Sequence, residues 1–247
     1  MARTSKIQWT NATWNPWHGC KKVSEGCKFC YMYRDKNRYG LDASIVMRSK
    51  TKFYDPSKWE EPKLIFTCSW SDWFIKEADD WRAEAWEIIK KNPQHTFQIL
   101  TKRPERVSAC LPKDWNDGYK NVWLGVSVET SKEIERIQLL NNIPSYLKFV
   151  SFEPLLSNIN WDESFNFLDW IIIGGESGNN TGKYLFRAME LSWMENLIHH
   201  STKNSIKCFV KQLGSYQAKR LNLKHKNAEN ISEWNLKYQI QEIPNTK

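Results

Sequence analysis

The sequence predicts an α/β fold, which we interpret as an incompletely closed barrel of parallel strands. Short apolar runs typical of buried strands recur along the whole chain, and amphipathic segments separate several of them. Strands that alternate with helices imply parallel pairing through right-handed crossovers. Polar or charged residues follow the apolar runs, and parallel α/β folds build their sites at that end of the strands. The 247 residues suit a single α/β barrel, and an open doubly wound sheet is the alternative.

The expected strands and helices follow one another in chain order. We expect seven strands, at residues 7–14, 64–68, 95–101, 122–128, 147–152, 170–173 and 207–210. The amphipathic stretches predict helices at residues 78–91, 132–141 and 190–200. Asp79 or Asp80 is the expected N-cap of the first helix, because a carboxylate can accept hydrogen bonds from the unpaired N–H groups of a first turn.

The last part of the chain differs in composition from the rest. Residues 215–247 are polar, rich in Asn and Lys, and without a clear hydrophobic period. We therefore predict a barrel domain at residues 1–214 and a short polar C-terminal appendage at residues 215–247.

Charge is unevenly distributed along the chain, which has a net charge of +8. Residues 1–58 carry 12 Lys or Arg against 4 Asp or Glu, whereas residues 59–200 carry 15 against 21. Residues 201–247 are basic again, with 9 Lys or Arg against 3 Asp or Glu. Two basic ends are typical of proteins with a phosphate-bearing partner, such as a nucleotide or nucleic acid. An ordinary solvated basic surface explains the same counts, so both interpretations stay open.

No segment of the sequence predicts a membrane or secretory location. The chain lacks an apolar run of about 18 residues, which excludes a membrane span. Its first six residues lack the apolar region of a secretory signal. We therefore expect a cytoplasmic protein, and in that reducing compartment a close group of cysteines indicates metal or redox chemistry more often than disulfides.

Three cysteines carry the strongest chemical signal. Cys20, Cys27 and Cys30 have the spacing Cys-x6-Cys-x2-Cys, with no fourth cysteine nearby. A structural zinc site needs four protein ligands, and a cubane cluster has four irons that are usually all held by thiolates. Three thiolates would leave one iron open to a small molecule. The alternatives are a zinc site with His18 as fourth ligand, a Cys27/Cys30 pair for disulfide exchange, and three unrelated structural cysteines.

Several longer stretches resemble one family. They are IQWTNATWNP at residues 7–16, LTKRPER at 100–106, GVSVE at 125–129, SFEPLL at 151–156 and IGGESG at 173–178. With the cysteines, they make the chain similar to a phage-associated three-cysteine-motif family, which looks like a branch of the radical S-adenosylmethionine superfamily. The resemblance covers residues 7–214. It implies a partial, TIM-like (β/α)6–7 barrel and a [4Fe–4S] cluster on the three cysteines. It also implies S-adenosylmethionine at the open iron, which is cleaved to a 5′-deoxyadenosyl radical.

The sequence departs from the superfamily in two places. The usual spacing is Cys-x3-Cys-x2-Cys, so the first gap here is longer. The superfamily's Gly-Gly-Glu element follows the second strand, whereas Gly174, Gly175 and Glu176 follow the sixth expected strand here. After the second strand the chain offers Ser69, Ser71 and Asp72 instead. We take Ser69, Asp72, Gly174 and Gly175 as candidate cofactor-binding residues.

We assign roles to the residues after the strands by matching each side chain to a chemical group of S-adenosylmethionine or the substrate. Lys102 or Arg103 suits the methionine carboxylate, because a cation is needed there. Ser127 and Glu129 suit the ribose hydroxyls. Glu153 and Glu176 are the candidate catalytic residues, to bind the ammonium group, orient the substrate or relay a proton. Ion pairs within the protein are the alternative role, for example Arg103 with Glu129 or Glu153.

Three functions remain open at this point. The first is a radical S-adenosylmethionine enzyme with an unknown substrate. The second is a zinc-bearing nucleic-acid-binding module. The third is a non-catalytic subunit of a partner protein encoded nearby.

Overall fold

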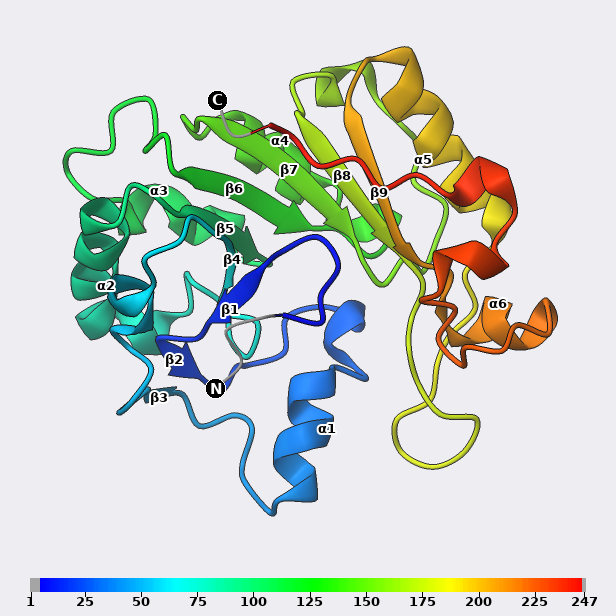
Figure 1. The fold of residues 1–247 in the computed structure, drawn as a ribbon, viewed down its shortest axis with the longest axis horizontal. Coiled ribbons are helices and arrows are strands. Elements are labelled where there is room, and N and C mark those ends of the chain that lie inside the picture. The colour runs from blue at the N-terminus through cyan, green and yellow to red at the C-terminus, as the bar shows by residue number, and fades with distance from the viewer. Residues whose placement is uncertain (1–4, 246–247) are drawn as a thin grey trace. The chain divides into compact units, whose positions relative to one another are not determined.

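The computed structural model describes residues 5–245 (Figure 1). The chain forms two compact units, and chain segments cross from one to the other several times. Unit 1 contains the residues up to Val23 together with Tyr31–Val126 and Leu139–Lys148. Unit 2 contains Ser24–Cys30, Ser127–Gln138 and the residues from Phe149 onward. Residues 1–4, which are part of the stretch that we used to predict the absence of a secretory signal, lie outside the described residues.

Seven strands form one sheet whose order follows the chain, β1-β4-β5-β6-β7-β8-β9. Their bounds are β1 Ala12–Trp14, β4 Leu64–Thr67, β5 Thr96–Thr101, β6 Val122–Ser127, β7 Leu147–Phe152, β8 Trp170–Gly174 and β9 Lys207–Gln212. Each lies within, or within two residues of, a strand that the sequence predicts, so the α/β prediction is confirmed. The order does not reverse as it does in a doubly wound sheet, and it is the order expected of a partial barrel.

Within each unit the strands pair in parallel. In unit 1, Ala12 pairs with Ile65 and Phe97 with Val122. In unit 2, Phe149 pairs with Trp170, and β9 follows β8 along its other edge. All residues of β6 and β8 are buried, as is typical of parallel strands covered on both faces. Parallel pairing brings the carboxyl ends of neighbouring strands to one edge, and it is there that the predicted polar residues lie.

Three of the six α-helices among residues 5–245 correspond to the predicted ones, one of them beginning three residues later than expected, and the other three are short helices that the sequence did not predict. Their bounds are α1 Tyr31–Arg38, α2 Asp79–Lys91, α3 Val107–Cys110, α4 Glu135–Asn141, α5 Leu191–Lys203 and α6 Gly214–Arg220. The predicted capping of α2 by Asp79 or Asp80 is wrong, because Ala78 is the N-cap and no side chain caps it. Asp79 instead accepts hydrogen bonds from Arg82 (2.6 Å) and Arg106 (2.7 Å). The two guanidinium groups thus compete successfully with the helix backbone for this carboxylate.

Unit 1 is built around a chain of tryptophan rings. Trp14 and Trp17 both pack against Trp73, with ring centroids 5.7 and 5.1 Å apart, and Trp73 continues to Trp86 at 5.0 Å. The indole N–H of Trp17 donates to the backbone oxygen of Asp72 (3.1 Å). Since buried indole groups need such partners, the tryptophan core also fixes the backbone that follows β4. The antiparallel pair of β2 (Trp17–His18) and β3 (Met47–Arg48) extends this unit.

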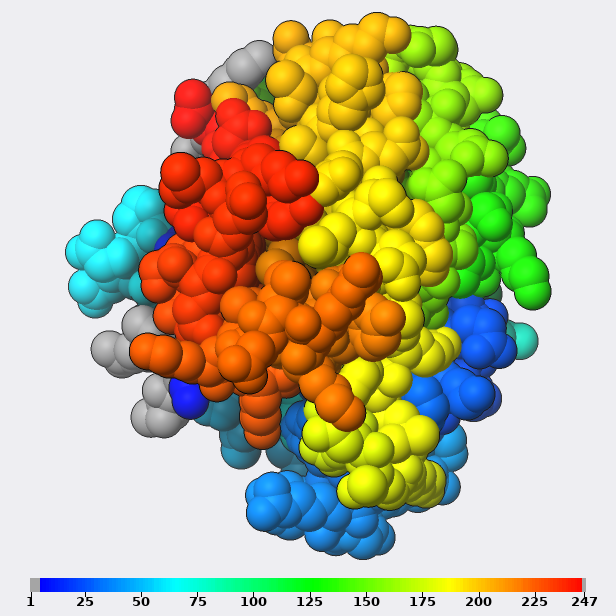
Figure 2. Space-filling model, turned by 90° about the vertical axis from the view of Figure 1, so that its right-hand side faces the viewer, coloured from blue at the N-terminus to red at the C-terminus, as the bar shows by residue number. Residues whose placement is uncertain are grey.

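The residues after α6 pack against the rest of unit 2. Trp234 and Tyr238 are buried, and the chain then pairs with β9 through a hydrogen bond from Val210 N to Ile240 O (2.8 Å). Figure 2 shows α6 and the following residues (orange to red) beside α5 (yellow to gold), where Lys237 bonds to Glu195 (2.8 Å). Whether residues 215–247 form a separable appendage stays a prediction.

Candidate functional site

The loop that carries Cys20 is tied to the carboxyl ends of β4 and β5 in unit 1. Gly19 N donates to Trp70 O (3.0 Å), and Ser71 Oγ donates to Gly19 O (2.6 Å). Arg103 Nη2 donates to Lys21 O (2.7 Å). These bonds hold the backbone on both sides of Cys20, so its thiol has a defined position at the end of the strands.

A buried ion pair lies beside the Cys20 thiol. Asp72 and Arg103 are 4 % and 7 % exposed, and Arg103 Nη1 lies 3.0 Å from Asp72 Oδ2. The carboxylate also accepts hydrogen bonds from Thr101 Oγ1 (2.7 Å) and Lys102 N (2.9 Å). Arg103 Nη1 lies 3.9 Å from Cys20 Sγ. Asp72 and Arg103, both predicted to bind a cofactor, are therefore each other's partners, and the guanidinium group also faces the thiol.

Charge rather than solvent exposure governs the protonation of Arg103. Burial disfavours the guanidinium ion, but the charges of Asp72 and Cys20 outweigh burial and raise the pKa of Arg103. The side chain is thus a permanent cation in a largely buried setting. A neighbouring cation favours the thiolate form of a cysteine, which is the form that binds metal.

Ser69 has a more structural setting. Its hydroxyl accepts a hydrogen bond from Asn15 Nδ2 (3.0 Å), and its backbone oxygen accepts one from Tyr31 OH. Asn15 Oδ1 also accepts from Trp70 N (2.8 Å). Ser69 and Asn15 therefore join the end of β1 to the turn after β4.

In unit 2, a buried carboxylate holds the turn that carries Cys27 and Cys30. Glu129 is fully buried and accepts hydrogen bonds from Ser24 Oγ (3.1 Å) and Arg136 Nη1 (3.0 Å). Ser24 Oγ lies 3.8 Å from Cys27 Sγ. A Cβ atom on Gly26 would lie 2.3 Å from Glu129 Cγ, so only glycine lets the turn approach the carboxylate this closely. Glu129 thus positions the Cys27 turn, a role that the ribose-binding prediction did not include.

Glu176 also holds this turn, through Arg187. Arg187 Nε donates to Glu176 Oε2 (2.8 Å), and Arg187 Nη1 donates to Glu25 O (3.0 Å). The Arg187 guanidinium also lies 5.2 Å from the ring centroid of Phe29, within cation–π range. Glu176 is only 7 % exposed, so its carboxylate is largely committed to Arg187.

Glu153 is the most accessible of the predicted carboxylates. Its side chain is 19 % exposed and pairs with Lys211, which is 24 % exposed, at 2.5 Å. Gly174 lies against it, since an added Cβ would be 3.1 Å from Glu153 Cδ. Gly175 meets the backbone after β9, where a Cβ would be 2.3 Å from Leu213 O. Close backbone packing therefore accounts for Gly175.

Ser127 lies at the end of β6 and is 4 % exposed. Its backbone oxygen accepts a hydrogen bond from Arg136 Nη1 (2.7 Å), the same nitrogen that pairs with Glu129. Arg136, Arg187 and Ser24 are residues that the sequence analysis missed. Ser24 and Arg187 act through partners 105 and 162 residues away, which no local pattern indicates, whereas Arg136 lies only 7 residues from Glu129.

None of the six cysteines forms a disulfide. Within residues 5–245, no group of three or more His, Cys, Asp or Glu side chains is arranged to hold a metal ion. The ligand role of Cys20, Cys27 and Cys30 therefore stays a prediction that rests on their chemistry and spacing.

Comparison with known families gives one match. The sequence fits the family described as "Protein of unknown function (DUF5131)" over residues 4–239. The chain belongs to this family. No curated protein and no solved structure matches it. In this DUF5131 member, no helix among the described residues is long and apolar enough to cross a membrane.

All of the predicted site residues lie inside the family region. Cys20 and the residues after β4 and β5 lie in unit 1, whereas Cys27, Cys30 and the residues after β6, β7 and β8 lie in unit 2. In each unit, buried ion pairs hold the backbone near the cysteines. Most of the predicted charged residues therefore serve the protein's own structure as well as any ligand.

Proposed function

We propose that this protein is a radical S-adenosylmethionine enzyme with a TIM-like partial barrel, in which Cys20, Cys27 and Cys30 hold a [4Fe–4S] cluster. The observation that carries the proposal is the set of three cysteines outside disulfides, spaced Cys-x6-Cys-x2-Cys, in backbone held by buried charged residues. Cysteines outside disulfides also suit the reducing cytoplasm, which we propose as the location.

The residues around the thiols fit an anionic metal cluster. Iron–sulfur clusters are bound by thiolates, and the Arg103 guanidinium 3.9 Å from Cys20 Sγ supplies compensating positive charge. In the Cys27 turn, Gly26 and the Ser24–Glu129 hydrogen bond fix the backbone. When bound, the cluster and S-adenosylmethionine would supply a 5′-deoxyadenosyl radical that takes a hydrogen atom from the substrate.

The protein's own residues divide into two proposed roles. Glu153 and Lys211 are partly exposed, and can bind an ammonium and a carboxylate group of a ligand by opening their ion pair. Glu176 and Glu129 are buried and bonded to arginines, so we assign them to positioning the Cys27 turn. Lys102 and Ser69 remain candidates for contacts with S-adenosylmethionine.

The test is anaerobic reconstitution with iron and sulfide, reduction, and mass spectrometry for 5′-deoxyadenosine. We expect about four irons per chain and formation of 5′-deoxyadenosine in the wild type. Cys27→Ala should lose both. Cys110→Ala, which removes a thiol outside the motif, should retain them. Stoichiometric zinc with no iron after reconstitution would contradict the proposal.

One observation favours the zinc-bearing nucleic-acid-binding module as a second candidate. His18 Nδ1 is buried and has no hydrogen-bond partner. Burial, and secondly the charge of Lys36, lower the pKa of His18, so the imidazole is neutral at pH 7 and able to bind metal. A zinc site would lose its metal in His18→Ala, whereas the cluster of the first proposal would survive that change.

A further inference from the structure

An exposed apolar and basic surface lies beside α1 in unit 1, on side chains to which no role has been assigned above. We define the α1–β3 surface by Arg38, Tyr39, Leu41, Ile45, Met47 and Lys50. We propose that this surface binds single-stranded nucleic acid.

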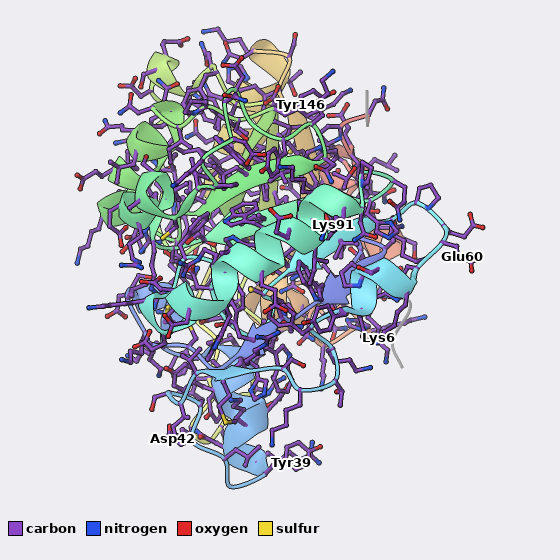
Figure 3. All side chains as sticks on the ribbon, turned by 90° about the vertical axis from the view of Figure 1, so that its left-hand side faces the viewer. Lys6, Tyr39, Asp42, Glu60, Lys91 and Tyr146 are labelled. Atoms are coloured by element: carbon purple, nitrogen blue, oxygen red, sulfur yellow. The ribbon has the colours of Figure 1, made fainter. Side chains whose placement is uncertain are left out.

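The first observation is the exposure of its large side chains. Tyr39 is 74 % exposed, Leu41 54 %, Ile45 53 % and Met47 46 %. Four such side chains within nine consecutive positions are unusual for a water-facing loop, because contiguous exposed apolar groups mark interaction sites. Figure 3 shows the labelled Tyr39 near one end of α1.

The second observation is the positive charge of the segment. Residues 31–52 contain six Lys or Arg and two Asp. Both aspartates have local partners, since Asp35 pairs with Arg34 (2.9 Å) and Asp42 accepts hydrogen bonds from Ser44 N (2.8 Å) and Ser44 Oγ (2.7 Å). Among residues 5–245, no ion pair engages Arg38 or Lys50. These two cations are available to an external anion.

The third observation is that the backbone beneath the surface is anchored. Cys20 N donates to Ala43 O (3.0 Å), and Leu41 N donates to Lys36 O (3.0 Å). Ala43 is 2 % exposed, and Met47 pairs with His18 in the β2–β3 ladder. The loop is therefore fixed at its middle and at β3 while its apolar side chains face outward. Such preorganisation lowers the entropic cost of binding a ligand.

Single-stranded nucleic acid is the occupant that these features favour. Phosphates need lysine and arginine, and unpaired bases need exposed aromatic or apolar side chains to stack upon. A duplex hides the faces of its bases, so it would leave Tyr39 and its apolar neighbours without a partner. A membrane-binding segment usually presents these side chains along one face of an amphipathic helix, whereas here they lie on a loop and a two-residue strand.

The proposed surface does not rest on the cluster chemistry. None of its six residues is a predicted metal or cofactor ligand. Binding should therefore persist in Cys27→Ala, and a failure of the radical chemistry would leave this inference intact.

The experiment is fluorescence anisotropy of the full-length protein with a fluorescein-labelled 20-nucleotide single strand, the matching duplex, and anionic phosphatidylglycerol vesicles as competitor. Arg38→Glu/Lys50→Glu should weaken binding at least tenfold. It should also reduce the slope of log affinity against log salt concentration by the amount that corresponds to the loss of one or two phosphate contacts. Tyr39→Ala should weaken it about fivefold or more and leave the salt dependence unchanged. Lys6→Glu/Lys91→Glu is the control, because it makes the same charge change at exposed positions labelled in Figure 3.

Three outcomes would overturn the proposal. One is equal loss of binding in the two double variants, which would mean that only net charge matters. Another is equal or tighter binding of the duplex. The third is binding of vesicles without binding of the single strand, which would make the surface a membrane contact. Circular dichroism of each variant checks that the fold is retained.

Discussion

The two cysteine-bearing segments are held in place by opposite kinds of charge. In unit 1, the Cys20 thiol faces a cation, since Arg103 Nη1 lies 3.9 Å from its sulfur atom. In unit 2, the Cys27 turn rests against an anion, since Glu129 binds Ser24 and crowds Gly26. In both units the nearby charge is buried and neutralised, by Asp72 for Arg103 and by Arg136 for Glu129.

The opposite charges affect the two cysteine-bearing segments in different ways. A cation beside the sulfur atom favours the thiolate directly. A carboxylate bound to a serine and an arginine cannot do so, and its contribution is to fix the shape of the turn. We therefore expect changes at Asp72 and Arg103 to alter charge balance, and changes at Gly26 and Glu129 to alter geometry.

The largest effect on stability is expected from Asp72→Ala. The change leaves the Arg103 guanidinium buried without its carboxylate and removes the acceptor for Thr101 and Lys102, which should cost about 3–5 kcal/mol in the free energy of unfolding. Urea unfolding measures it. Asp114→Ala is the control, because it breaks an exposed ion pair between Lys90 and Asp114, whose side chains are 49 % and 50 % exposed. It should lower the free energy of unfolding by less than about 1 kcal/mol. Similar costs for the two variants would show that burial of the Asp72 pair does not matter.

A smaller effect is expected from Gly26→Ala, which tests whether geometry governs the Cys27 turn. The added methyl group would collide with the Glu129 carboxylate and should cost about 1–3 kcal/mol. The same change made in a Glu129→Ala background should cost clearly less, because the atoms that it meets are gone. Urea unfolding of the four proteins gives the coupling energy of this cycle. Additive costs would show that Glu129 does not set the position of the turn.

The smallest effect is a pH dependence of stability from His95 in the core of unit 1. Burial lowers the pKa of His95 below 6.5, and its hydrogen bond with Pro56 O offsets burial only in part. As the pH falls below about 6.5, the unfolded chain therefore binds a proton that the folded protein resists, and stability decreases. His95→Gln should reduce the loss of stability between pH 7 and pH 5, measured by urea midpoints. His199→Gln, at an exposed position, should leave that loss unchanged.

The strands could be predicted because buried parallel strands need continuous apolar runs. β6 and β8 are buried at every position and fall within two of the clearest runs. The polar residues after the strands followed from chain order alone. The cap of α2 could not be predicted, because Asp79 has two arginine partners in the folded protein, one of them 27 residues away in the sequence.

The partners of the candidate residues depended on contacts between distant parts of the chain. The hydrogen bond between Ser24 and Glu129 spans 105 residues, and that between Arg187 and Glu25 spans 162. No spacing rule reaches that far. The arginines that bind Glu129 and Glu176 are nearer, 7 and 11 residues away, but their pairing also depended on the fold, and the sequence assigned both carboxylates to ligands.

The sequence by itself determined the alternation of strands and helices, the spacing of the three thiols and the charge of the chain. Each of these depends on neighbouring residues, because the local hydrophobic period and the peptide connections fix them. Only the tertiary structure decided which charged side chains neutralise each other and which stay exposed, as Glu153 and Lys211 partly do. A buried charge must find its counter-ion in three dimensions, and the Arg103 that neutralises Asp72 comes from the end of a different strand.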